Sequence, residues 1–247
     1  MPPTDQYVRN ASELWRSLAA ARGHRVVAEP EWLLVDAGAD PGETHILLRA
    51  PVVDARMPDL LRLAAGASRP TRVEDPFGVV DLAAAGFAVK RLPTMVRGAA
   101  PAPAPPTPSA GGEADVRQVR DADSLAQAER VTIDGYPRPQ YADAAPGRMY
   151  PPALLEMDRL AVYLATVRDR PVGACLAVRD GHGGGVYWVA VLPGYRRRGV
   201  ATSLMLATLR GLAGMPVSLC ASAAGFALYQ RLGFATVSMS GWWRAEA

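Results

Sequence analysis

The sequence contains very little lysine, and its charges of opposite sign nearly balance. Lys90 is the only lysine among 27 basic residues, which face 24 acidic residues, and the net charge is +3. Because the charges are mixed along the chain, they do not predict the broad basic face of a nucleic-acid-binding protein. The abundance of arginine, alanine and proline is most simply the mark of a GC-rich genome. We therefore expect no nucleic-acid partner.

The sequence also lacks a disulfide framework, a metal-binding motif and a long apolar run. Its two cysteines, Cys175 and Cys220, stand alone in apolar surroundings, which is typical of buried thiols. The apolar stretch Leu204–Leu212 is interrupted by Thr208 and Arg210, and a membrane span needs roughly 18 apolar residues. The N-terminal sequence MPPTDQYVRN does not have the pattern of a secretory signal. We expect a cytoplasmic protein with no metal and no membrane contact.

Composition predicts a packed core, and one segment divides the chain. Hydrophobic residues make up 49% and charged residues 21% of the 247 residues, which is typical of globular domains. Gly98–Gly112 (GAAPAPAPPTPSAGG) has five prolines and no charge, as an extended linker does. The sequence therefore predicts a small domain at 1–97, a linker at 98–112 and a second domain at 113–247.

Both predicted domains combine helices with short strands. Before the linker, helical spacing is found at 12–21 and 57–65, and the apolar runs 32–35 and 46–48 flank an ADPGET turn, which predicts a hairpin. After the linker, helices are expected at 121–133 and 152–157, and strands at 160–167, 172–178 and 186–192. The fold class is therefore α/β, of the mixed-sheet α+β kind.

The segment 186–213 (VYWVAVLPGYRRRGVATSLMLATLRGLA) carries the clearest chemistry. An apolar strand runs into a glycine- and arginine-rich turn, and an amphipathic helix follows. Free backbone N–H groups at the start of a helix bind anions, and small side chains leave them accessible. A diphosphate suits this turn, although a solvated basic turn with no ligand is the plainer alternative. The sequence has neither a Gly-Lys-Ser/Thr phosphate loop nor a dinucleotide-binding GxGxxG motif.

Further along, 217–221 predicts a strand and 222–232 a helix that ends in the segment LYQRLGF. This order of strand, R-x-x-G-x-A turn, helix, strand and L-Y-x-R-L-G-F segment resembles the GNAT family of acyl-CoA-dependent N-acyltransferases, over roughly 116–243. The resemblance implies the GNAT fold, preceded by the smaller α/β domain. It also implies that acetyl-CoA is the co-substrate.

The resemblance implies a role for particular residues. The strand backbone would bind the pantetheine arm at Val189, Ala190 and Val191. The pyrophosphate would lie on the turn formed by Arg196, Arg197, Arg198, Gly199, Val200 and Ala201. Tyr229 would protonate the departing thiolate. For Ser222 a cofactor contact and a helix cap are equally open.

The implied reaction is direct attack of an amine on the acetyl-CoA carbonyl. The competing mechanism would use Cys220 as an acyl-carrying nucleophile, but the three histidines are distant from it in sequence or lie in expected loops. The strand before the turn holds no carboxylate that could act as general base. Asp134, Glu156 and Asp158 are candidates, and each is also well explained as a solvated surface charge.

The stretch 134–150 (DGYPRPQYADAAPGRMY) is long and rich in turns and aromatic residues, which suits a loop that lines the acceptor site. Tyr136 and Tyr141 in this stretch, together with Trp188, are candidate acceptor-contacting residues. Tyr150 would be a further part of the same apolar wall, and Trp242 or Trp243 would close it. Such a wall would favour an uncharged or aromatic amine over a polyamine. The acceptor is expected to be a small molecule or a peptide, and the protein a monomer or homodimer.

The segment at 82–87 (LAAAGF) weakly repeats the YQRLGF of 229–234. If this echo is genuine, the first domain is a degenerate, truncated copy of the second, with Leu82 in place of Tyr229 and no R-x-x-G-x-A turn. A binding or scaffolding role then suits this domain. Two other functions stay open for the chain: a non-catalytic acyl-CoA-binding sensor or scaffold, and a nucleic-acid module that uses Arg196–Arg198.

Overall fold

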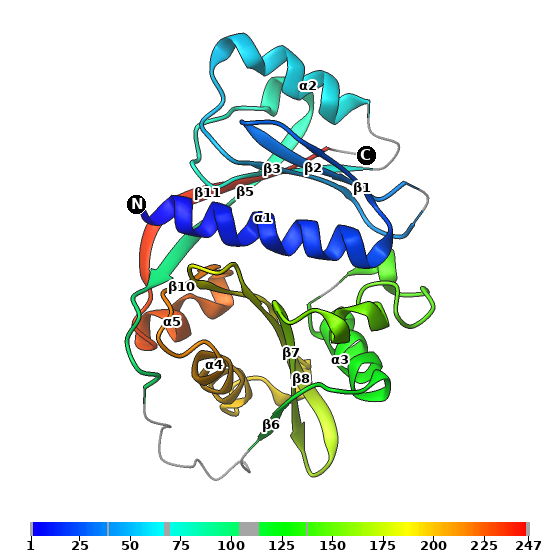
Figure 1. The fold of residues 1–247 in the computed structure, drawn as a ribbon, viewed down its shortest axis with the longest axis vertical. Coiled ribbons are helices and arrows are strands. Elements are labelled where there is room, and N and C mark those ends of the chain that lie inside the picture. The colour runs from blue at the N-terminus through cyan, green and yellow to red at the C-terminus, as the bar shows by residue number, and fades with distance from the viewer. Residues whose placement is uncertain (1, 39, 67–69, 104–113, 137, 246–247) are drawn as a thin grey trace. The chain divides into compact units, whose positions relative to one another are not determined.

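The computed structural model describes residues 2–38, 40–66, 70–103, 114–136 and 138–245 (Figure 1). The chain forms two compact units. The first consists of residues 1–96 together with 218–247, and the second of residues 97–217. This division differs from the one predicted from sequence, because the last thirty residues belong with the N-terminal part. Most of the predicted linker, 104–112, lies outside the described residues.

Two helices of the first unit lie before the proline-rich segment. Helix α1 spans Pro3–Arg22, with a proline in its first turn, and Gly23 ends it in the left-handed conformation at φ 69°. The apolar spacing at 12–21 predicted only its second half, because polar residues dominate the first half. Helix α2 spans Met57–Ala65, as predicted, and buries Leu60 and Ala64.

The strands of the first unit form a mixed sheet. They are β1 (Arg25–Ala28), β2 (Trp32–Asp36), β3 (Thr44–Leu48), β4 (Thr71–Asp75), β5 (Phe87–Arg97) and β11 (Ala235–Ala245), in the spatial order β1-β2-β3-β4-β11-β5. The predicted β2–β3 hairpin is confirmed, with Trp32 opposite Leu48. Strands β3 and β4 are parallel, and α2 lies in the crossover that such a pair requires. Leu34, Ile46, Val73 and Trp243 contribute to the core.

The internal echo has a structural counterpart within the first unit. Phe87 N–H donates to Leu82 O at 3.2 Å, and Phe234 N–H donates to Tyr229 O at 3.0 Å. The glycines between them, Gly86 and Gly233, have φ values of 80° and 85°, which favour glycine. The two strands that follow, β5 and β11, pair with each other in antiparallel register. The first copy differs in having only the short 3-10 turn η2 (Ala83–Ala85), where the second has helix α5 (Ala223–Arg231).

The second unit is an antiparallel sheet with helices on both faces. Its strands are β6 (Asp115–Gln118), β7 (Leu160–Val167), β8 (Arg170–Arg179) and β9 (Gly184–Val191), in the spatial order β9-β8-β7-β6. Helix α3 (Ala122–Gly135) packs close to Ala190, and helix α4 (Val200–Gly211) packs close to Gly173. Because Gly173 lies opposite Val191 in the register, the two helices cover opposite faces (Figure 1).

Two differences from the predicted elements are local. The segment predicted as a helix at 152–157 is the 3-10 turn η4 (Pro152–Glu156), because it is too short to continue between its prolines and the next strand. Strand β10 (Val217–Cys220) begins at the boundary of the two units. None of the described helices combines the length and apolarity that crossing a bilayer requires.

Candidate active site

Strand β9 is distorted at Trp188, directly before the segment expected to bind the pantetheine arm. Ala174 of β8 lies opposite Ala190, and Leu176 lies opposite Tyr187, so β9 has one more residue than β8 in this interval. Trp188 has a φ of 51°, which is rare for a non-glycine residue. This β-bulge interrupts the ladder and redirects the Trp188 side chain. Val189 and Val191 are half-buried and Ala190 is buried.

The turn after β9 leads into α4 through two residues in the left-handed region. Pro193–Tyr195 forms the 3-10 turn η5, and Arg197 and Gly199 have φ values of 59° and 84°. Arg196 Nε donates to Val191 O at 3.1 Å, and its Nη2 donates to Gly135 O at 3.0 Å. Arg196 therefore ties the turn to the end of β9 and to the end of α3. The Arg198 guanidinium lies over the Tyr195 ring, 5.6 Å from its centroid.

The start of α4 fits a diphosphate. Gly199 is the N-cap residue of α4 and, being a glycine, supplies no side-chain cap to the N–H groups of the first turn. A side chain built at Gly199 would meet no atom within 4 Å, so the approach to these N–H groups is open. Val200 is buried and Ala201 is half-buried. Together with the positive end of the helix and the exposed arginines, this is the donor set that a diphosphate needs.

An aromatic and cationic cluster lies beside the bulge of β9. Tyr150 stacks on Trp188, with 6.0 Å between ring centroids and 27° between ring planes. The Arg138 guanidinium lies 4.9 Å from the Tyr136 ring centroid and 5.4 Å from that of Trp188. The structure thus brings Tyr136 and Trp188 to one cation, and Tyr150 contacts the Trp188 ring. Tyr141 of η3 (Pro139–Tyr141) is 5% exposed and belongs to the core.

Glu129 is a buried carboxylate that sequence reasoning did not select. It is 3% exposed on α3, and it accepts hydrogen bonds from the backbone N–H groups of Gly147, Met149 and Tyr150 at 2.6, 2.6 and 3.0 Å. One signal in the sequence could have found it. Leu125, Ala128 and Thr132 define the buried face of α3, and a glutamate on that face needs a partner.

The carboxylates considered as general base lie at the surface. Asp134 pairs with Arg130, and the hydrogen bond from this arginine lowers the pKa of the Asp134 carboxyl. A lowered pKa makes a carboxylate a weaker base. Glu156 and Asp158 are exposed. The described geometry therefore favours none of the three as a base.

Tyr229 and Ser222 belong to the first unit, whereas the turn belongs to the second. Tyr229 on α5 is 7% exposed, and its ring meets Phe234 edge-on with 6.1 Å between centroids. Ser222 occupies the N-cap position of α5, but its side chain makes no capping hydrogen bond. The Ser222 hydroxyl therefore does not cap α5 in the structure.

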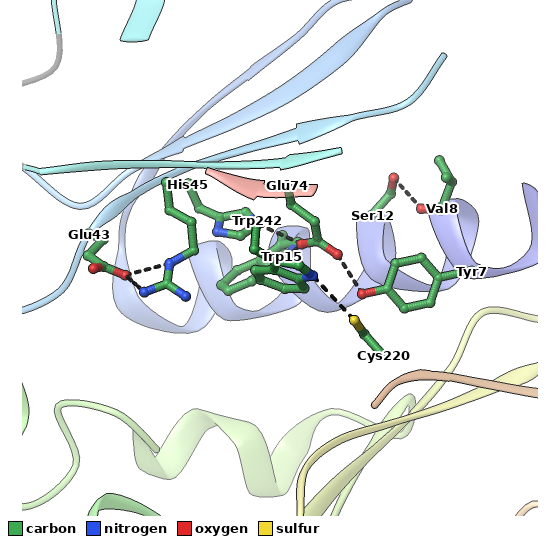
Figure 2. Close-up of polar contacts among 10 residues, drawn as sticks. Tyr7, Val8, Ser12, Trp15, Glu43, His45, Glu74, Cys220 and Trp242 are labelled. Carbon is green, nitrogen blue, oxygen red and sulfur yellow. Dashed lines mark hydrogen bonds and ion pairs between the residues drawn. The ribbon is translucent and has the colours of Figure 1, made fainter. Parts of the chain in front are cut away.

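The first unit contains a buried polar cluster around Glu74 (Figure 2). Glu74 is 1% exposed and accepts hydrogen bonds from Tyr7 Oη at 2.5 Å, His45 Nε2 at 2.8 Å and Trp15 Nε1 at 3.3 Å. The His45 ring stacks on Trp15 with 3.7 Å between centroids, and burial lowers the His45 pKa. His45 lies on β3 rather than in a loop. The hydrogen bond between His45 and Glu74 joins the neighbouring strands β3 and β4 inside this core.

Both thiols are unsuited to nucleophilic chemistry. Burial raises the pKa of Cys175 and of Cys220 to about 12, and a nucleophilic cysteine needs a lowered pKa. Trp242 Nε1 donates to Cys220 Sγ at 3.2 Å (Figure 2). Within the part of the chain that the structure describes, no three histidine, cysteine, aspartate or glutamate side chains gather as metal ligands.

Comparison with known proteins places this geometry in a family. The family model described as "Acetyltransferase (GNAT) domain" matches residues 158–236. No curated protein matches the sequence significantly. The matched range runs from β7 through the turn and α5 into β11, and so includes the R-x-x-G-x-A turn and Tyr229.

Three solved structures are similar to the chain over most of its length. A GCN5-related N-acetyltransferase from Kribbella flavida has a TM-score of 0.71 and 17% identity, over 100% of this chain and 97% of that one. A GNAT-family acetyltransferase from Novosphingobium aromaticivorans has a TM-score of 0.60 and 18% identity, over 97% and 96%. A tandem GNAT protein from the clavulanic acid biosynthesis pathway has a TM-score of 0.54 and 16% identity, over 87% and 78%. The chain therefore has the GNAT fold, and its residues 158–236 match the GNAT acetyltransferase domain.

Proposed function

We propose that this protein is an N-acetyltransferase that moves the acetyl group of acetyl-CoA to a primary amine by direct attack in a ternary complex. The family domain supports acyl transfer, and the start of α4 supports a diphosphate-bearing donor. The single observation that carries the proposal is the left-handed Gly199 with open space before the uncapped N–H groups of α4.

Each part of the site has a role in this proposal. The first turn of α4 and Arg196–Arg198 hold the diphosphate, because aligned N–H groups and cations offset its charge. The backbone of Val189–Val191 holds the pantetheine arm. Tyr136 and Trp188, with Arg138 between them, face the acceptor. Acetyl-CoA supplies an activated thioester carbonyl.

The reaction balances without an enzyme-bound acyl group. The amine nitrogen forms a bond to the thioester carbonyl carbon, and the carbon–sulfur bond breaks. The ammonium form of the acceptor first loses one proton to water, and the nitrogen loses a second proton after it has attacked. Tyr229 gives its hydroxyl proton to the departing sulfur and takes up this second proton through water, so the net products are the amide and the free thiol. The raised pKa values of the buried thiols argue against a route through Cys220.

A thiol-release assay tests the proposal. Wild-type protein would be incubated with acetyl-CoA and, separately, tyramine, spermidine, kanamycin and a lysine-containing peptide with a free N-terminus. We expect free CoA to appear only with an amine present, together with an N-acetylated product detected by mass spectrometry. Binding of acetyl-CoA in calorimetry without turnover of any amine would instead identify a sensor. No binding at all would contradict the proposal.

A further inference from the structure

Glu129 on α3 binds the loop after this helix, at a segment well separated from it in the sequence. Its Oε2 accepts from Gly147 N–H, and its Oε1 accepts from both Met149 N–H and Tyr150 N–H. One side chain thus collects the N–H groups of a segment that lies 18 to 21 residues away in the sequence. The segment Gly147–Tyr150 wraps around the carboxylate as a backbone nest wraps around a bound anion.

The arrangement demands a carboxylate at this position. Glu129 is 3% exposed, and burial of an ionised carboxylate is costly unless hydrogen bonds compensate it. Hydrogen bonds from N–H groups to a charged acceptor are among the strongest that proteins form. Gly147 has a φ of 87°, which turns its N–H toward the carboxylate at a conformation that favours glycine.

The held segment ends at the ring that contacts Trp188. Tyr150 N–H binds Glu129, while the Tyr150 ring stacks on Trp188. Tyr150 Oη also lies 3.3 Å from Thr132 Oγ1 on α3. The backbone and the ring of Tyr150 are therefore both fixed, and the position of Trp188 at the β9 bulge depends on them.

Trp188 marks the acyl end of the donor site under the proposed function. The diphosphate binds at the turn after Val191, and the pantetheine arm runs back along β9 from Val191 to Val189. The next residue in that direction is Trp188, so the thioester and the attacking amine meet near its ring.

We propose that Glu129 is a positioning residue for the amine acceptor: it holds Gly147–Tyr150 so that the Tyr150 ring, which is 1% exposed, supports Trp188, and the Trp188 ring forms the wall against which the acceptor binds. This inference rests on the proposed function. It assigns to Glu129 an effect on the acceptor and none on acetyl-CoA, because Glu129 contacts the loop and lies on α3 rather than on the turn.

The main test is Glu129→Gln, with Glu29→Gln at an exposed position of the first unit as control. The glutamine has nearly the same size, but one of its two oxygens becomes an NH₂ group that cannot accept an N–H. We expect the KM for the best amine of the panel to rise about tenfold. The KM for acetyl-CoA should stay within twofold of wild type, and the control should match wild type in both.

Hydrogen exchange gives a second measurement. In Glu129→Gln, peptides that cover 142–150 should exchange their amide hydrogens at least tenfold faster than in wild type, with the rest of the second unit unchanged. This measurement needs no substrate and reports whether the carboxylate holds the loop.

A second variant addresses the same contact without changing the buried charge. Gly147→Ala strains the loop backbone that donates to Glu129. The added methyl group would lie 3.6 Å from its nearest neighbour and so would not clash, but alanine disfavours the positive φ of this position. Gly181→Ala, at φ 82° in an exposed turn, is its matched control. Gly147→Ala should raise the acceptor KM as Glu129→Gln does, and Gly181→Ala should not.

The outcomes separate the two proposals. An active wild type with an unchanged acceptor KM in Glu129→Gln and Gly147→Ala overturns the role of Glu129 and leaves the proposed function intact. An equal rise of both KM values assigns Glu129 a general structural role and also overturns the inference. If Glu129→Gln does not fold, Gly147→Ala decides. A wild type that binds acetyl-CoA and acetylates no amine overturns both.

Discussion

Arg196 Nη2 donates a hydrogen bond to the backbone carbonyl of Gly135 at 3.0 Å. Gly135 is the last residue of α3, and a side chain built there would lie 3.1–3.2 Å from Val191 and Ala190. The same guanidinium binds Val191 O. One arginine of the expected diphosphate turn therefore also fixes the geometry of the turn against α3 and β9.

Arg196→Lys should weaken acetyl-CoA binding. Lysine keeps the positive charge, but it lacks the planar fork that reaches two carbonyls at once. We expect the Kd of acetyl-CoA to rise about three- to tenfold, which corresponds to about 0.7–1.4 kcal/mol, while Arg210→Lys, at the exposed far end of α4, stays near wild type. Calorimetry measures both. Identical affinities of the two variants would show that the turn does not depend on these hydrogen bonds.

Gly199→Val should abolish tight acetyl-CoA binding and leave the fold intact. A β-branched residue at φ 84° is strained by about 1–3 kcal/mol, and its methyl groups enter the open space before α4. We expect the Kd to rise at least tenfold. Gly194→Val is the control, because Gly194 lies in the same turn, has no left-handed φ and meets no atom within 4 Å. Unchanged affinity in a folded Gly199→Val protein would contradict the diphosphate site.

Tyr229→Phe should lower kcat and leave acetyl-CoA affinity nearly unchanged. The ring and its edge-on contact with Phe234 remain, and only the hydroxyl proton donor is lost. A general acid typically contributes about 10²–10⁴-fold, and a tenfold loss would be weak support because a thiolate leaves readily. Tyr163→Phe on β7 is a buried tyrosine control. Wild-type kcat in Tyr229→Phe, with chemistry limiting the rate, would leave Tyr229 a core residue only.

A fragment of residues 113–247 should not fold fully. Its last strand, β11, pairs with β4 and β5, and both are missing from the fragment. Unpaired strand edges with apolar faces aggregate. We therefore expect, against the linker-based division, that this fragment is less soluble than the full chain. Size-exclusion chromatography and thermal melting measure this, and a monomeric fragment with a cooperative transition would refute it.

The buried thiols should make the protein less stable at high pH. The pKa of Cys175 and that of Cys220 are raised from 9.0 to about 12, so between these values the native state keeps protons that the unfolded state has lost. Stability is then complete below pH 9 and falls as the pH rises toward 12, by up to about 1.4 kcal/mol per pH unit and thiol. Denaturant titrations of wild type and Cys220→Ala measure this. Equal slopes above pH 9 in the two proteins would contradict it for Cys220.

Local patterns predicted several elements closely. The helical spacing of 57–65 and the apolar strand predicted at 160–167 coincide with α2 and β7. The turn before α4 could also be predicted from the sequence, because its conformation depends on Gly199 and on neighbouring residues of the same segment. The bulge at Trp188 was not, because it arises from pairing with β8 and leaves no mark in the composition of β9.

The sequence by itself determined the turn that we propose as the donor side of the site. An R-x-x-G-x-A turn between a strand and a helix is a local feature, and glycine is the residue type that readily adopts the left-handed φ found at Gly199. Only the tertiary structure decided that β11 belongs with β4 and β5, and that Glu129 holds Gly147–Tyr150. Both depend on hydrogen bonds between residues far apart in the chain, and such partners are chosen by the packing of whole elements rather than by local propensity.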